Sequence, residues 1–373
     1  MDRWLLITLL VLVAALVAAA VYAVVQARAA ERRTPPIGRF LEVDGVRLHY
    51  LERGEGDPVV LLHGNGGLIQ DLTVSGLMDG LSGHHRVIVF DRPGFGYSTR
   101  PRSRIWTPQA QAEVLRKALD QLGVKQAVVL GHSWGTLVAV SLALQAPTLV
   151  RGLVLLSGYY FPTARLDVPL LLPPAIPVIG DVMRYTVSPL LGRLLLPPLI
   201  RKLFEPAPVP ERFDRLFPTA MTLRPSHLRA SAADTALMVP AAAELQARYR
   251  ELKMPVTIMT GGDDKIVDVG RQSRRLHDEL SQSQFISLPG LGHMVHHLAP
   301  DQAMQAVEQI ASGQMTRVTD LKKNCTRSCI LKSSSTSGIF AKHAAYHSQH
   351  QLWMQLATDG ATQNVMSWQC GAT

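Results

Sequence analysis

The chain has 373 residues, of which 47% are hydrophobic and 18% are charged, so it can bury a sizeable core as one large domain with additions or as two domains. Part of its formal net charge of +9 comes from the two ends of the chain. No concentrated basic stripe falls in the body, so a nucleic-acid partner is not indicated. All three cysteines (Cys325, Cys329 and Cys370) lie near the C-terminus, so the body needs no disulfide framework.

The chain begins with a long apolar run. Residues 4–25 carry no charge and are mostly apolar. About 20 such residues cross a bilayer core as a helix, whereas the apolar part of a secretory signal has only about 7–15. We therefore predict a membrane anchor and linker over 1–38; a cleaved signal and a buried helix are the alternatives. Three arginines follow the run and one precedes it, which favours a cytoplasmic body, while a periplasmic body stays open.

The body alternates between strand and helix patterns. Period-two alternation at 40–43 and 46–50, around Asp44-Gly45, predicts a hairpin. Short apolar runs predict strands at 58–62, 86–90, 127–130, 152–156, 256–259 and 284–288. Helices are predicted at 108–122, 134–146, 269–280 and 300–312. Buried strands that alternate with helices indicate an α/β fold with a mostly parallel sheet, covered by helices on both faces.

A proline-rich segment interrupts this alternation. Residues 159–252 contain 14 of the 24 prolines of the chain, along with leucine-rich runs. The segment is typical of short helices separated by proline, and we predict that it forms a lid over the carboxyl edge of the sheet. The alternative is an inserted packing layer. The core of the fold would then consist of 39–158 and 253–313.

The strongest motif is Gly131-His132-Ser133-Trp134-Gly135, which follows a predicted strand and precedes a predicted helix. In this context G-x-S-x-G is a nucleophile elbow, a sharp turn on which the serine Oγ projects clear of the backbone. The turn brings neighbouring backbones close together, so the two glycine positions must be small. We predict that Ser133 is a nucleophile.

A glycine-rich turn, His63-Gly64-Asn65-Gly66-Gly67, follows the strand at 58–62. Its backbone N–H groups can face a reacting carbonyl. We predict an oxyanion hole formed by the backbone N–H groups of Asn65 and Trp134. An ordinary glycine turn is the alternative.

A triad acid and base should follow the serine in this order. Asp263 and Asp264 come directly after the strand at 256–259, and Asp268 is a more distant candidate. His293 ends the glycine loop after the last strand, and its competitors, His296 and His297, lie farther from the strand end.

These motifs together resemble the α/β-hydrolase superfamily over roughly 39–313. The resemblance rests on the glycine turn, on Asp91-Arg92-Pro93-Gly94-Phe95-Gly96-Tyr97-Ser98, on the elbow, on 261–267 and on Gly292-His293. It implies an eight-stranded sheet with a lid after strand six. Its Gly-x-x-Asp and Gly-His patterns select Asp264 and His293 as acid and base, and the loop at 91–98 is implied to be structural.

The resemblance implies a serine hydrolase. We predict cleavage of an ester or similar acyl bond in a small lipophilic substrate; a carbon–carbon bond hydrolase, a peptidase, an acyltransferase and a non-catalytic binding relative are the alternatives. Haloalkane dehalogenases and epoxide hydrolases of this fold need a carboxylate at the elbow, which Ser133 does not provide. No cofactor or metal is implied.

The last segment, 314–373, shows no periodic core signal, and we predict a disordered or loosely helical tail. Its four-residue spacings, Cys325 to Cys329 and His343 to His347, do not match usual zinc sites.

Overall fold

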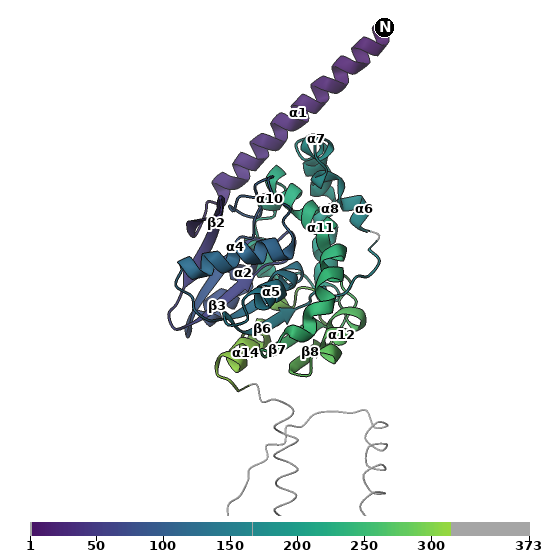
Figure 1. The fold of residues 1–373 in the computed structure, drawn as a ribbon. Helices are drawn as coiled ribbons and strands as arrows, with labels where there is room; N and C mark the ends of the chain where they lie inside the picture. Colours follow the sequence, from purple (N-terminus) through teal and green to yellow (C-terminus); the bar gives the residue numbers. More distant parts are fainter. Residues whose placement is uncertain (1, 166, 315–373) are drawn as a thin grey trace, which may run out of the picture. The chain divides into compact units, whose positions relative to one another are not determined.

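The computed structural model describes residues 2–165 and 167–314. One eight-stranded sheet runs through the body in the order β1-β2-β4-β3-β5-β6-β7-β8 (Figure 1). Its strands are β1 (Arg39–Val43), β2 (Val46–Arg53), β3 (Asp57–Leu62), β4 (His85–Phe90), β5 (Ala127–His132), β6 (Val150–Leu156), β7 (Val256–Gly261) and β8 (Ser283–Leu288). The hairpin β1–β2 is antiparallel and also pairs antiparallel to β4, while all other pairs are parallel. The predicted mostly parallel, eight-stranded sheet is confirmed.

The core lies on both faces of this sheet because successive strand residues point to opposite sides. In β3, Val60 and Leu62 belong to one buried cluster and Val59 and Leu61 to the other. The first cluster is shared with α4 (Pro108–Gln121), α5 (Trp134–Gln145) and α12 (Arg275–Glu279), and the second with α2 (Ile69–Val74), α3 (Leu77–Leu81) and α14 (Pro300–Ala311).

Two details differ from the sequence prediction. The short helices α2 and α3 were not expected, because each is too short for a helical period to be visible. The helix predicted at 269–280 begins as a π-turn, Gly270–Arg274, and only its second part, α12, is α-helical.

A helical segment is inserted between β6 and β7, where the sequence predicted it. It contains α6 (Asp167–Leu171), η1 (Pro173–Ala175), α7 (Ile179–Met183), α8 (Val187–Phe204), α9 (Glu211–Leu216), α10 (Thr219–Thr222), α11 (Pro225–Leu245) and η2 (Gln246–Glu251). The expectation that proline limits these helices to short pieces was wrong for α8 and α11, which have 18 and 21 residues with prolines inside them. Pro197 and Pro198 of α8 are exposed, so water can replace the hydrogen bonds that they remove.

The N-terminal run forms α1 (Arg3–Arg33), whose 31 residues are long and apolar enough to cross a membrane. Length and composition fit a membrane span and a signal sequence equally. The C-terminal end of α1 packs on the body through Ala30, and Glu31 pairs with Arg224 at 2.8 Å. The Tyr97 hydroxyl also donates to the carbonyl of Thr34 at 2.6 Å. The disordered tail was predicted over 314–373, of which residues 315–373 lie outside the described residues.

Candidate active site

Ser133 occupies the turn between β5 and α5. Its backbone has φ 51° and ψ −121°, outside the usual helix and strand regions. A Cβ on Gly131 would lie 2.7 Å from the carbonyl oxygen of Gly135, and a Cβ on Gly135 would lie 2.6 Å from the carbonyl oxygen of His63. Only glycine fits at either position, which is the close approach expected of a nucleophile elbow. Ser133 is partly exposed, while the residues on either side of it are buried.

The three side chains predicted as a triad lie within hydrogen-bond distance of one another. His293 Nε2 lies 2.9 Å from Ser133 Oγ, and His293 Nδ1 lies 2.7 Å from Asp264 Oδ2. Asp264 follows β7, and His293 lies in the loop after β8. Residues 133, 264 and 293 therefore meet at the carboxyl ends of three parallel strands of one sheet, β5, β7 and β8.

The partners of His293 define its tautomer. An ionised carboxylate can only accept hydrogen bonds, so Nδ1 carries the proton and donates to Asp264, which leaves Nε2 to accept from the Ser133 hydroxyl. Burial alone would raise the pKa of Asp264, but His293 and the backbone N–H groups of Ile266 and Val267 outweigh it and lower that pKa below its usual value. Asp264 therefore stays ionised at neutral pH.

The competing carboxylates lie elsewhere. Asp263 accepts a hydrogen bond of 2.8 Å from the N–H of Gly290, and Asp268 accepts one of 2.7 Å from the N–H of Arg271. Neither bonds to a histidine among the described residues. The structure brings Asp264 alone of these three to His293.

The competing histidines bind a different carboxylate. His296 Nε2 and His297 Nε2 lie 3.2 Å and 2.8 Å from Asp71 Oδ1, and all three side chains are buried. Burial opposes ionisation of Asp71, yet both imidazoles hold its pKa well below the usual value. Their ligand atoms lie within 4.8 Å of one another, so among the described residues this group has the composition of a metal site. Two hydrogen bonds to one oxygen already account for the arrangement.

The glycine turn at 63–67 is held by Arg92. The Arg92 guanidinium donates 2.9 Å hydrogen bonds to the carbonyl oxygens of His63 and Gly64. The backbone N–H groups of Asn65 and Trp134 have no hydrogen-bond partner among the described residues. Unpaired N–H groups are the donors that an oxyanion hole requires. Arg92 fixes the turn that carries one of them, the N–H of Asn65.

The inserted segment also fixes this turn through α11. The Asn65 side-chain amide donates to the carbonyl of Ser231 at 3.2 Å and to Thr235 Oγ1 at 2.9 Å. His227 Nε2 lies 3.1 Å from the carbonyl oxygen of Gly66. These contacts could not be predicted from the sequence, because nothing in the pattern of α11 indicates which of its side chains point at a loop more than 160 residues away.

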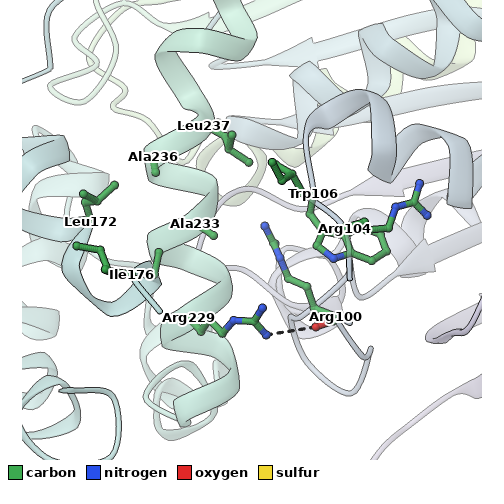
Figure 2. A pocket seen from close by; sticks show the side chains of 11 residues that line it. Arg100, Arg104, Trp106, Leu172, Ile176, Arg229, Ala233, Ala236 and Leu237 are labelled. Atoms are coloured by element: carbon green, nitrogen blue, oxygen red, sulfur yellow. Dashed lines mark hydrogen bonds between the residues drawn. The ribbon is translucent and has the colours of Figure 1, made fainter. Parts of the chain in front are cut away.

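A hollow of about 310 Å³ lies between α11, the segment 100–106 and the start of the inserted segment. In Figure 2, Leu172 and Ile176 lie to the left of α11, while Arg229 and Leu237 of α11 point to the right, toward the segment 100–106. The Arg229 guanidinium donates to the carbonyl of Arg100 at 3.3 Å. Residues 133, 264 and 293 do not line this hollow.

A mostly parallel eight-stranded sheet with a serine elbow after β5 defines an α/β-type hydrolase fold. Residues 57–300 match a sequence model of the family described as alpha/beta hydrolase fold, and the chain therefore belongs to this family. The superfamily resemblance inferred from the motifs is confirmed.

Similarity to individual proteins extends over most of the chain. A 2-hydroxy-6-oxo-2,4-heptadienoate hydrolase from Pseudomonas putida is 29% identical over 269 residues, which cover 69% of this chain and 90% of that protein. The crystal structure of a membrane phospholipase A, described as a bacterial virulence factor, has a TM-score of 0.57 at 24% identity and covers 84% of this chain and 99% of its own. The structure of a thermophilic esterase from Thermogutta terrifontis has a TM-score of 0.58 at 21% identity, and the match covers 75% of this chain and 100% of the esterase chain. At such identities the two structures show a common fold alone.

Proposed function

We propose that the chain is a membrane-anchored serine hydrolase that cleaves an ester or similar acyl bond through an acyl-enzyme. The observation that carries this proposal is the continuous hydrogen-bonded line from Ser133 through His293 to Asp264, with distances of 2.9 Å and 2.7 Å. Binding-only relatives of an enzyme fold have no need of such a line, since it serves to activate a hydroxyl.

In the first half of the reaction, His293 Nε2 takes the proton of Ser133 as Oγ attacks the carbonyl carbon. Asp264 stabilises the imidazolium that forms. The N–H groups of Asn65 and Trp134 hold the oxyanion, and one such donor typically contributes about 3–4 kcal/mol. Collapse of the tetrahedral intermediate passes the proton from His293 to the leaving alcohol.

In the second half, a water molecule attacks the acyl carbon bound to Ser133 Oγ. His293 takes the water proton and returns it to Oγ as the carboxylic acid leaves. The chain is regenerated, and the net change is the addition of one water across the acyl bond. No cofactor enters this scheme.

We propose a lipophilic acyl substrate. The inserted segment is rich in leucine, valine and proline, and α1 would hold the body at a membrane. A single-pass anchor is proposed on the length of the apolar run.

A carbon–carbon bond hydrolase is the second candidate. It is favoured by the similarity to a hydrolase whose named substrate, 2-hydroxy-6-oxo-2,4-heptadienoate, contains a ketone and a carboxylate but no ester. The same three side chains serve either reaction, so the substrate distinguishes the two.

The test combines labelling with a substrate series. A fluorophosphonate probe should label the full-length chain at Ser133, and Ser133→Ala should abolish both labelling and turnover without loss of the fold. Full activity in Ser133→Ala would end the proposal. Among p-nitrophenyl esters, octanoate should exceed acetate in kcat/KM. A preference for acetate would contradict the lipophilic substrate, and turnover of the keto-acid alone would favour the second candidate.

A further inference from the structure

The inserted segment exposes an unusual amount of apolar surface. Outside α1, the exposed large hydrophobic side chains of the described residues are Ile37, Ile105, Leu216 and thirteen that lie between 170 and 199. Leu170, Val178 and Leu194 are 77%, 74% and 74% exposed, and they belong to α6, to the start of α7 and to α8. We call the thirteen side chains the lid apolar surface. Soluble proteins rarely leave so many large apolar side chains together in water.

Charged groups are nearly absent from this part of the chain. Residues 170–199 contain three, Asp181, Arg184 and Arg193. The Asp181 carboxylate bonds to Arg102 and Arg184, so it is neutralised locally. The remaining cation, Arg193, bonds to the hydroxyl of Tyr22, and its guanidinium carbon lies 5.0 Å from the centre of that ring. The helix α8, which carries part of the lid apolar surface, therefore contacts α1 through Arg193, which has no carboxylate partner among the residues that the structure describes.

The position of Tyr22 shows where along α1 the contact with Arg193 lies. Trp4 begins the apolar run and Tyr22 lies three residues before its end at position 25; a helix that joins the two rises about 27 Å. A bilayer core is about 30 Å thick, and Trp and Tyr concentrate at its two boundaries. If α1 spans the bilayer as proposed, Tyr22 would lie at the boundary nearer the body, and Arg193 of α8 contacts α1 at that level. In Figure 1, α7 and α8 lie on the side of the body toward which α1 projects.

We propose that the lid apolar surface docks onto the bilayer leaflet that α1 enters on the body side. This inference rests on the proposed anchor. The leucine and valine side chains of α6, α7 and α8 would insert at the boundary between headgroups and acyl chains, where apolar faces of surface helices reach about 5–10 Å deep. Arg193, at the level of Tyr22, is placed to contact lipid phosphates.

Docking has a consequence for the substrate. Leu172 and Ile176, at the start of the inserted segment, line the hollow beside α11, and Ile176 is also part of the lid apolar surface. The segment that would touch the bilayer thus also forms one wall of a hollow in the body. A lipophilic compound dissolved in the leaflet would reach this wall without crossing water, although residues 133, 264 and 293 do not line the hollow itself.

Site-specific fluorescence of the full-length chain in phosphatidylcholine–phosphatidylglycerol vesicles tests the docking. In a background in which the three cysteines are replaced by serine, Val178→Cys, Leu194→Cys, Val11→Cys and Lys125→Cys each take one environment-sensitive label. Val11 reports on the anchor, and Lys125, which is 85% exposed, is the matched soluble control. Nitroxide-labelled lipid should remove about half or more of the emission at 178, 194 and 11 and leave position 125 unchanged.

The possible outcomes separate the two proposals. Quenching at position 11 without quenching at 178 and 194 would overturn the docking and leave the anchor intact. Absence of quenching at position 11 as well would overturn the anchor and the docking together, while fluorophosphonate labelling of Ser133 would still test the catalytic proposal. Labels at 178 and 194 that are shielded from iodide but not quenched by nitroxide lipid would indicate a contact between two chains, which also overturns the docking.

An activity measurement supplies a second readout. Leu194→Glu places a charge on the lid apolar surface at an exposed position, so the fold should tolerate it. We expect at least a tenfold lower rate on a long-chain ester carried in vesicles, and an unchanged rate on a soluble short-chain ester. Equal rates of Leu194→Glu and the unaltered chain on the vesicle substrate would contradict the docking.

Discussion

The Arg92 guanidinium donates a 2.8 Å hydrogen bond to the carboxylate of Asp234, and both side chains are fully buried. This pair joins the loop after β4 to α11 of the inserted segment. Arg92 also holds the carbonyls of His63 and Gly64, and Asp234 accepts a second bond from Arg100 at 2.9 Å. The glycine turn beside Ser133 is therefore coupled to the inserted segment through one buried ion pair.

Removal of the Asp234 charge should destabilise the fold strongly. Asp234→Asn leaves Arg92 buried without an anionic partner, and breaking such a pair costs about 3–5 kcal/mol of the free energy of unfolding. Chemical denaturation of the full-length chain measures the loss. The control is Asp120→Asn, because Asp120 is 77% exposed and lies 4.0 Å from Lys125. A loss in Asp234→Asn no larger than in this control would show that the pair contributes little.

The two neighbouring carboxylates after β7 should differ sharply in their effect on turnover. Asp264→Asn cannot hold the His293 tautomer that accepts from Ser133, and loss of such a carboxylate lowers kcat by about 10⁴. Asp263→Asn serves as the matched control, because Asp263 contacts the N–H of Gly290 and not the imidazole. Steady-state kinetics on one ester measures both. Comparable kcat values for the two variants would remove Asp264 from the proposed mechanism.

The elbow should not accept even a methyl group. In Gly135→Ala the new Cβ would lie 2.6 Å from backbone oxygens of Leu62 and His63, and backbone cannot yield as a flexible side chain can. We expect a loss of stability of about 1–3 kcal/mol or more and a displaced Ser133. Gly83→Ala is the control, because its Cβ would meet an oxygen at 3.7 Å, an ordinary contact. Thermal melts and fluorophosphonate labelling rates measure the two effects; a Gly135→Ala variant that matches Gly83→Ala in both would refute the packing argument.

Local signals account for what the sequence predicted. The runs that became β3 to β7 are mostly apolar on both faces, a pattern typical of a covered parallel strand. These five strands and the edge strand β8 were all placed within a few residues. Glycines lie close to Ser133 and His293 in the sequence, at positions that tight turns require. The choice of Asp264 over Asp263 came from the family pattern, since both follow the same strand and spacing alone does not separate them.

Long-range packing accounts for what the sequence did not predict. The α8 helix contains Pro197 and Pro198, which local propensity treats as helix breakers, and only their exposure in the folded chain makes them tolerable. The contacts of Arg92 with Asp234 and of His227 with Gly66 join residues 142 and 161 positions apart. No periodicity or short motif encodes such a distance.

Buried neutral histidines should make the fold sensitive to acid. Burial, and then the nearby Arg224, lowers the pKa of His227 from 6.5 to about 3. Between these pH values the unfolded chain binds a proton that the folded chain does not. The contribution of neutral His227 to the free energy of unfolding is therefore fully present above about pH 6.5 and is lost as the pH drops toward 3. The slope for one such group is about 1.4 kcal/mol per pH unit.

His227→Gln isolates this contribution. The glutamine amide can still donate to the carbonyl of Gly66, as His227 Nε2 does at 3.1 Å, but it does not titrate. Loss of the ring contact with Phe95 should lower stability equally at every pH, so the informative quantity is the slope. Denaturation curves between pH 7.5 and pH 5 give the free energy of unfolding at each pH. This free energy should fall less steeply with falling pH for the variant, and the difference in slope should correspond to about one proton. His63, with a pKa lowered to about 4, and the other buried histidines keep the remaining slope. Parallel curves for the variant and the unaltered chain would mean that His227 does not take part in acid destabilisation.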